Sequence, residues 1–99
     1  MDKTTRIERR IEKIKQALED LGDMRPGSLS VQTRSWGGKY HQLSYTHLGK
    51  GHTQYIPQQS VNEVKRQLAN YRKFKQLTQE WVTLSIELCK LKMTQDQND

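Results

Sequence analysis

Residues 28–56, SLSVQTRSWGGKYHQLSYTHLGKGHTQYI, decide the fold expected of this chain. They are rich in Thr, Tyr, Val and Ser, and glycines interrupt them at Gly37-Gly38 and at Gly49-Lys50-Gly51. Strand-forming residues separated by glycine turns are typical of antiparallel hairpins. The segment therefore predicts three short strands, near residues 28–36, 39–47 and 52–56.

The Gly37-Gly38 pair sets the expected register of the first hairpin. A two-residue turn there pairs Trp36 with Lys39 and Arg34 with His41. Side chains alternate between the two faces of a sheet. One basic and aromatic face is then expected to carry Gln32, Arg34, Trp36, Lys39, His41, Leu43 and Tyr45. The opposite face is the expected packing face, and it carries Leu29, Val31, Thr33, Tyr40 and Ser44. A slip of one residue would reverse this assignment.

Helical patterns on both sides of the meander make the expected fold class α+β. Residues 1–23 contain a capping box, Thr5 to Glu8, and apolar residues at heptad spacing: Ile7, Ile11, Ile14, Leu18 and Leu21. Residues 60–93 open with a second capping box, Ser60 to Glu63, and contain neither glycine nor proline. The expected order within one domain is an amphipathic helix (1–23), a basic meander (24–57), a long helix (60–93) and a disordered tail (94–99).

The long helix is expected to have two sections, because its apolar spacing shortens from four to three between Tyr71 and Phe74. The second section predicts coiled-coil-like pairing with another copy or a partner through Leu77, Trp81, Leu84, Leu88 and Leu91. Val82, Ile86 and Cys89 widen its apolar arc. Leu, Ile, Val and Phe total only 20 of 99 residues, so the core is thin and a shared core is expected.

The charge is concentrated in the middle of the chain. Residues 1–23 carry six basic and six acidic side chains, whereas residues 24–75 carry nine basic residues and one acid, Glu63. A block this one-sided repels itself unless a polyanion neutralises it. We therefore expect nucleic acid, DNA or RNA, as the partner of this block.

The expected contacts with nucleic acid lie on the turns and on the first section of the long helix. They are Arg25, Arg34, Trp36, Lys39, His41, Lys50, Lys65, Arg66, Arg72 and Lys73, with Tyr45 as a further candidate. Cations hold phosphates, and exposed rings stack on bases or sugars. Neither G-x-x-x-x-G-K-[ST] nor G-x-G-x-x-G occurs, so positive φ angles in a turn explain Gly37-Gly38 better than a phosphate-binding loop does.

Neither a metal site, a cofactor nor catalysis is expected. His41, His47 and His52 do not have the spacing of common metal ligands. The single acid between residues 24 and 75 leaves paired-carboxylate chemistry without local groups. Cys89, the single cysteine, is expected to be a buried, inert thiol, and its isolation favours a reducing, cytoplasmic location. No stretch is apolar enough to span a membrane.

Three segments resemble a family of domains of unknown function. They are Gly27-Ser28-Leu29, the run GKGHTQYI at 49–56, and Gln67-Leu68 with Tyr71-Arg72 and Phe74. The resemblance covers about residues 24–92, and members of that family are small prokaryotic proteins often encoded beside transposases. It implies a role in handling the nucleic acid of a mobile element, and it carries no catalytic residues over to this chain.

The leading hypothesis from the sequence is a non-enzymatic accessory protein that binds the nucleic-acid backbone. An adaptor whose helices dock on a larger transposase or nuclease is the alternative. An inhibitor or regulator of a nucleic-acid enzyme is a third possibility.

Overall fold

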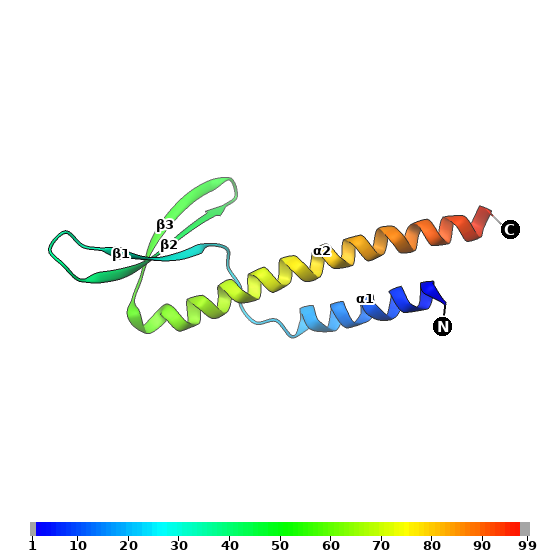
Figure 1. Cartoon of the computed structure of the whole chain (residues 1–99), viewed down its shortest axis with the longest axis horizontal. Helices are drawn as coiled ribbons and strands as arrows, with labels where there is room; N and C mark the ends of the chain where they lie inside the picture. The colour runs from blue at the N-terminus through cyan, green and yellow to red at the C-terminus, as the bar shows by residue number, and fades with distance from the viewer. Residues whose placement is uncertain (1, 98–99) are drawn as a thin grey trace. The chain divides into compact units, whose positions relative to one another are not determined.

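The structure is a computed structural model that describes residues 2–97 (Figure 1). Its elements are α1 (Lys3–Glu19), β1 (Ser28–Thr33), β2 (Lys39–His47), β3 (Lys50–Ile56), a short 3-10 turn (Gln58–Ser60) and α2 (Val61–Gln97). The α+β class expected from the sequence is confirmed. Residues 94–97 are helical where a disordered tail was expected, and residues 98 and 99 lie outside the described part.

Contacts within the chain group it into two compact units, where the sequence predicted one domain. The helical unit comprises Met1–Leu21 and Lys73–Asp99, and the sheet unit comprises Gly22–Arg72. The boundary falls inside α2, at the change of apolar spacing between Tyr71 and Phe74. The two sections of this helix therefore pack in different units, as a break in the heptad pattern allows.

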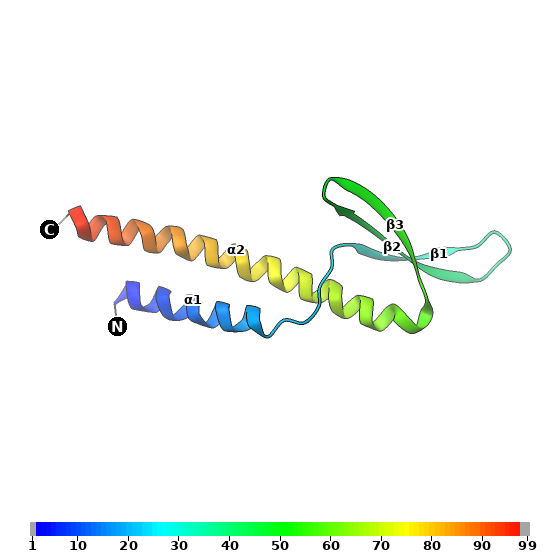
Figure 2. The same ribbon diagram turned by 180° about the vertical axis from the view of Figure 1, so that it is seen from behind.

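In the helical unit, α1 runs antiparallel beside the distal part of α2, from Lys73 onward (Figures 1 and 2). Its apolar series buries Ile7, Ile11 and Ile14, as heptad spacing predicts for a helix that packs along one neighbour. Two ion pairs cross the unit: the Nζ of Lys3 lies 2.9 Å from Glu87, and the Arg10 guanidinium donates two hydrogen bonds to Glu80. Hydrogen bonding to Arg10 lowers the pKa of Glu80.

The expected cap of α1 is wrong by one turn. Asp2 is the N-cap, and its carboxylate accepts a hydrogen bond of 2.8 Å from the backbone N–H of Thr5. This hydrogen bond lowers the pKa of Asp2. The second expected capping box does not form either, because the Glu63 carboxylate accepts hydrogen bonds from Arg66 and Gln67. A carboxylate in the first turn of a helix still interacts favourably with the helix dipole.

The three strands form an antiparallel sheet in the order β1-β2-β3. β1 pairs with β2 so that Thr33 faces Lys39 and Val31 faces His41. The connecting loop is therefore Arg34–Gly38, longer than the expected turn of two residues, and the expected pairs of Trp36 with Lys39 and Arg34 with His41 are wrong. The register differs from the expected one by an odd number of residues, and such a shift moves every β1 side chain to the other face relative to β2.

The second hairpin closes through a two-residue turn, Leu48-Gly49, so β3 begins at Lys50 and not at His52. Both turn residues have positive φ, 53° at Leu48 and 80° at Gly49. Positive φ at both central positions matches the right-handed twist of the flanking strands. Leucine in this conformation costs about 1 kcal/mol relative to glycine, and Leu48 is also 87% exposed.

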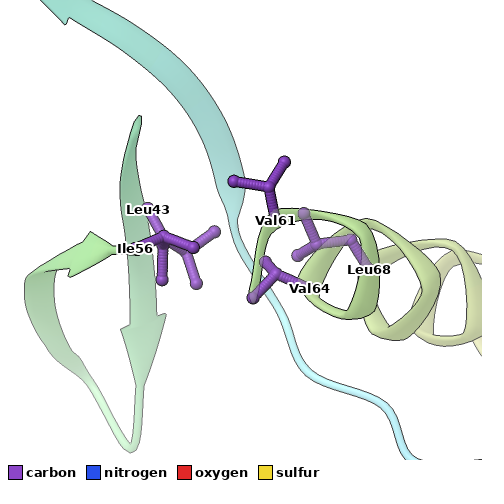
Figure 3. Packing of buried hydrophobic residues seen from close by; sticks show 5 residues of the cluster. All are labelled: Leu43, Ile56, Val61, Val64 and Leu68. Carbon is purple, nitrogen blue, oxygen red and sulfur yellow. The ribbon is translucent and has the colours of Figure 1, made fainter. Parts of the chain in front are cut away.

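The core of the sheet unit lies between the sheet and the first turns of α2. Leu43 and Ile56 point from β2 and β3 toward Val61, Val64 and Leu68 of the helix (Figure 3). Leu43 has no exposed surface at all. The face of the sheet that carries Leu43 is therefore the packing face. The sequence had assigned Leu43 to the binding face, and the odd shift in register explains the error, because it joins Leu29 and Val31 to Leu43.

Candidate nucleic-acid interface

The face of the sheet opposite Leu43, called here the outer face, carries uncharged polar and aromatic side chains. The register places on it Ser30, Gln32, Tyr40, Gln42, Ser44, Thr53 and Tyr55. Ser30 donates a hydrogen bond to the Gln42 carbonyl, and the Gln32 amide donates one of 3.0 Å to the Ser30 hydroxyl. Tyr40 and Tyr55 were not predicted as site residues, because the assumed turn had placed Tyr40 on the packing face.

A row of aromatic rings and one cation extends from this face to the first hairpin loop. It consists of Trp36, Arg34, Tyr40 and Tyr55, called here the aromatic row. The guanidinium carbon of Arg34 lies 5.9 Å from the ring centroid of Trp36 and 5.0 Å from that of Tyr40. The centroids of Tyr40 and Tyr55 are 6.2 Å apart. Guanidinium groups at such distances from rings are attracted by the ring quadrupole, which helps to orient Arg34.

The glycines of the first loop serve backbone geometry. Gly37 and Gly38 have φ angles of 94° and 83°, and an added Cβ would meet no atom within 4 Å at either. The loop closes through hydrogen bonds of 3.0 Å from Gly37 N to the Arg34 carbonyl and from Arg34 N to the Gly38 carbonyl. This geometry holds Trp36 at the tip with 81% of its surface exposed. The expectation that positive φ accounts for these glycines is confirmed.

A hollow of about 440 Å³ lies at the other end of the sheet. The outer-face residues that line it are small and mostly carry hydroxyl groups: Ser28, Ser44, Thr46, Gly51 and Thr53. Hydroxyls both donate and accept hydrogen bonds. This end of the outer face can therefore bind polar groups of either kind.

Arg25 and His41 are engaged with the protein. The Arg25 guanidinium stacks on Tyr45, 4.8 Å from its centroid, and donates a hydrogen bond of 3.0 Å to Gln54. Tyr45 in turn stacks on His52 at 4.9 Å. His41 is half-buried on the packing face. The structure thus separates both expected contacts from the outer face.

The expected helix cations are all exposed but differ in their surroundings. Lys65 and Arg72 line a groove of about 380 Å³ with Leu68, Gly27 and the first two residues of β1. Arg66 pairs with Glu63 at 2.6 Å, so its charge is already balanced. Lys73 falls in the helical unit.

Most of the exposed cations of the sheet unit have no acid to pair with. Residues 24–62 contain neither Asp nor Glu, and Glu63 is held by Arg66. Within residues 2–97, no ion pair reaches Lys39, Lys50, Lys65 or Arg72. The sheet unit therefore keeps an uncompensated positive charge at its surface.

The leucine series expected to mediate association lies beside α1. Leu77, Trp81, Leu84, Leu88 and Leu91 are half-buried. Lys15 of α1 lies 5.5 Å from the ring centroid of Trp81, and the Glu80 and Glu87 partners of α1 lie on this side of the helix. Packing within the chain therefore accounts for their burial.

A neighbouring stripe of α2 remains open. An apolar hollow of about 580 Å³ is lined by the residues called here the apolar stripe: Thr78, Trp81, Val82, Ser85, Ile86, Cys89, Lys90 and Met93. Val82 is 58% exposed and Ile86 is 53% exposed. Cys89 is also exposed, so the expectation of a buried thiol is wrong. Trp81 borders both surfaces, and the rest of the leucine series lies outside this stripe.

Residues 2–97 lack two further features. No group of three or more His, Cys, Asp or Glu side chains lies close enough together to hold a metal ion. No helix of that part of the chain combines the length and apolar character needed to cross a membrane.

A family model described as a domain of unknown function (DUF6788) matches residues 4–66. The match includes α1, which the resemblance noted in the sequence left out, and it ends in the first turns of α2. No curated protein and no solved structure matches the chain. The family match covers well over half of the sequence, and the chain therefore belongs to the DUF6788 family of domains of unknown function.

Proposed function

We propose that this protein is a non-enzymatic accessory protein that binds the backbone of nucleic acids through its sheet unit. The observation that carries the proposal is the absence of any acid from residues 24–62 together with exposed cations that lack ion-pair partners. Uncompensated surface charge of one sign raises the local concentration of a polyanion and speeds its association. A role in a mobile element is the finer part of the proposal and rests on the family resemblance of the sequence.

Lys39, Lys50, Lys65 and Arg72 are the proposed phosphate contacts. Each phosphate neutralised by a cation releases condensed counterions, so affinity falls as salt rises. Four contacts predict a loss of affinity of about 100-fold between about 50 and 200 mM salt. Titration of a labelled oligonucleotide at several salt concentrations measures this slope.

Lys65→Gln/Arg72→Gln tests the contribution of the helix. We expect weaker binding and a salt slope that is shallower by about two phosphate contacts. Arg6→Gln/Lys13→Gln is the matched control, because it removes one Arg and one Lys, also seven residues apart, from α1, where acidic residues are interleaved. The control is expected to leave the slope unchanged. Absence of binding at low salt, or binding without a salt slope, would contradict the proposed function.

A second candidate function is docking on another protein, and the apolar stripe of α2 favours it. Thr78, Val82, Ser85 and Cys89 follow one another at steps of four, three and four, which is the spacing of a coiled-coil seam. The lining of the stripe contains one charged residue, Lys90, so two identical stripes would not repel strongly. We therefore name a second copy of this chain as the occupant.

Val82→Glu/Ile86→Glu is expected to abolish self-association, because it places charges in an apolar contact. Light scattering over a range of protein concentrations measures the assembly. Gln76→Glu/Thr83→Glu adds the same charge at two exposed positions one heptad apart, about 100° or more around the helix from Val82, and should leave the assembly intact. A wild-type chain that stays monomeric at every concentration would exclude this occupant.

A further inference from the structure

We infer that the outer face of the sheet is a platform for unpaired nucleobases, so that the protein prefers single-stranded nucleic acid. The inference deepens the proposed function and rests on it. It starts from the aromatic row, in which Trp36, Arg34, Tyr40 and Tyr55 follow one another at 5.0 to 6.2 Å. Stacking of bases on aromatic side chains and on guanidinium planes is the usual way in which proteins hold unpaired bases.

The rings at the two ends of the row are open to a ligand. Trp36 is 81% exposed at the loop tip, and Tyr55 is 57% exposed on the sheet. Covering a large apolar or aromatic side chain with a flat ring removes its surface from water and therefore stabilises the complex. A base has a π face on each side, and a duplex hides these faces inside its stack. The exposed rings are therefore available to a single strand and of little use to a duplex.

The rest of the outer face fits base edges better than phosphates. The register puts no charged residue of the strands on it, and Gln32, Gln42, Ser44 and Thr53 supply donors and acceptors. The hydroxyl-lined hollow of about 440 Å³ continues this polar surface toward the second hairpin. Side chains of this kind can hydrogen-bond to the base edges that an unpaired nucleotide exposes.

The cations of the strands lie at the two ends of the meander and not on the outer face itself. Lys39 begins β2 beside the first loop, and Lys50 begins β3 beside the second turn, at opposite ends of the meander. The register gives both lysines the parity of Leu43, so they belong to the packing face and not to the outer face. Arg34 itself belongs to the aromatic row and combines charge with a stacking plane. A strand whose bases lie on the outer face therefore meets Arg34 within the aromatic row and the two lysines only where it passes the ends of the meander.

Binding of four probes by the full chain tests the inference. They are oligothymidylate and oligouridylate of about 12 nucleotides, a duplex of equal length, and an abasic deoxyribose-phosphate strand with the same number of phosphates. We expect at least one of the two single strands with bases to bind about 10-fold or more tighter than the abasic strand and the duplex. The stronger of the two shows whether a DNA strand or an RNA strand is the better ligand, and oligodeoxyuridylate, which lacks the thymine methyl group, separates the effect of the sugar from that of the methyl group.

Variants in the row locate the contact. Tyr55→Ala and Trp36→Ala are each expected to weaken single-strand binding by about 5-fold or more while leaving abasic-strand binding and the salt slope unchanged. Tyr55→Phe keeps the ring and should stay within about 2-fold of the wild type. Val31→Ala is the control on the opposite face, where Val31 is 56% exposed. In a Trp81→Phe background, oligothymidylate should quench the remaining Trp36 fluorescence.

The failures of the two proposals can be told apart. Equal binding of the abasic strand, the duplex and the single strands would overturn the base platform and leave phosphate binding standing. Unchanged single-strand affinity in Tyr55→Ala and Trp36→Ala together would also overturn it. Absence of binding to all four probes at low salt would overturn both proposals.

Discussion

Leu43→Ala is expected to lower the free energy of unfolding of the sheet unit by about 3 to 5 kcal/mol. Leu43 has no exposed surface, and its core cluster contains only four other buried residues: Ile56, Val61, Val64 and Leu68. Loss of its side chain removes buried apolar surface and leaves a cavity. The sheet and the helix can relax only partly to fill this cavity, because both are regular elements in close packing. Urea denaturation, followed by circular dichroism and by the amide signals of β2, measures the change.

Val31→Ala is the matched control for this substitution. Val31 lies on the same face of the sheet and two residues from Leu29, but it is 56% exposed. Its truncation should change the free energy of unfolding by about 0.5 kcal/mol or less. A loss below about 1 kcal/mol for Leu43→Ala would show that this cluster does not hold the sheet on α2.

Gly27→Ala is expected to cost about 2 to 4 kcal/mol, because two separate effects oppose any side chain at this position. The φ angle of Gly27 is 138°, a conformation that residues with a Cβ rarely adopt. An added Cβ would also lie 2.8 Å from Cδ1 of Leu43 and 3.1 Å from the carbonyl oxygen of Ser44. Neither the packed leucine nor the strand backbone can move away freely. The same denaturation experiment measures the loss.

Gly51→Ala provides the comparison within the same sheet. Gly51 has no atom within 4 Å of an added Cβ and no unusual φ, so its replacement should change the stability by less than about 1 kcal/mol. The double variant Gly27→Ala/Leu43→Ala should cost less than the sum of the single changes, because the shorter side chain relieves the close contact. Strict additivity of the two single changes would contradict the steric part of the explanation.

Local patterns in the sequence were sufficient for the elements of the fold. The heptad-spaced isoleucines of α1 are buried at the expected positions, since a stripe at that spacing can face only one side. The glycine-rich turns separate three strands as expected, and the break at Tyr71 to Phe74 coincides with the boundary between the two units. These features depend on residues close together in the chain, so the sequence displays them directly.

The candidate site was predicted only in part. Exposed cations such as Lys39, Lys65 and Arg72 follow from composition, because charged side chains seldom lie in a core. Tyr40 and Tyr55 were not predicted as site residues, because they share a face only through the alignment of the strands. Arg25 was expected at the interface, but it packs against Tyr45 and Gln54, which are distant in the sequence.

The sequence by itself determined the helices, the strands, the two glycine turns and the positive charge of residues 24–75, since each of these is a local or compositional property. Only the tertiary structure decided which face of the sheet is free and which stripe of α2 is open. Which face is free depends on the length of the first hairpin loop. A loop of two residues and a loop of five residues are both compatible with Gly37-Gly38, and the structure has the longer one. The resulting register shift is odd, and an odd shift exchanges the two faces. On α2, two adjacent apolar stripes compete for α1, and the pairs of Lys3 and Arg10 with Glu87 and Glu80 show which one it covers.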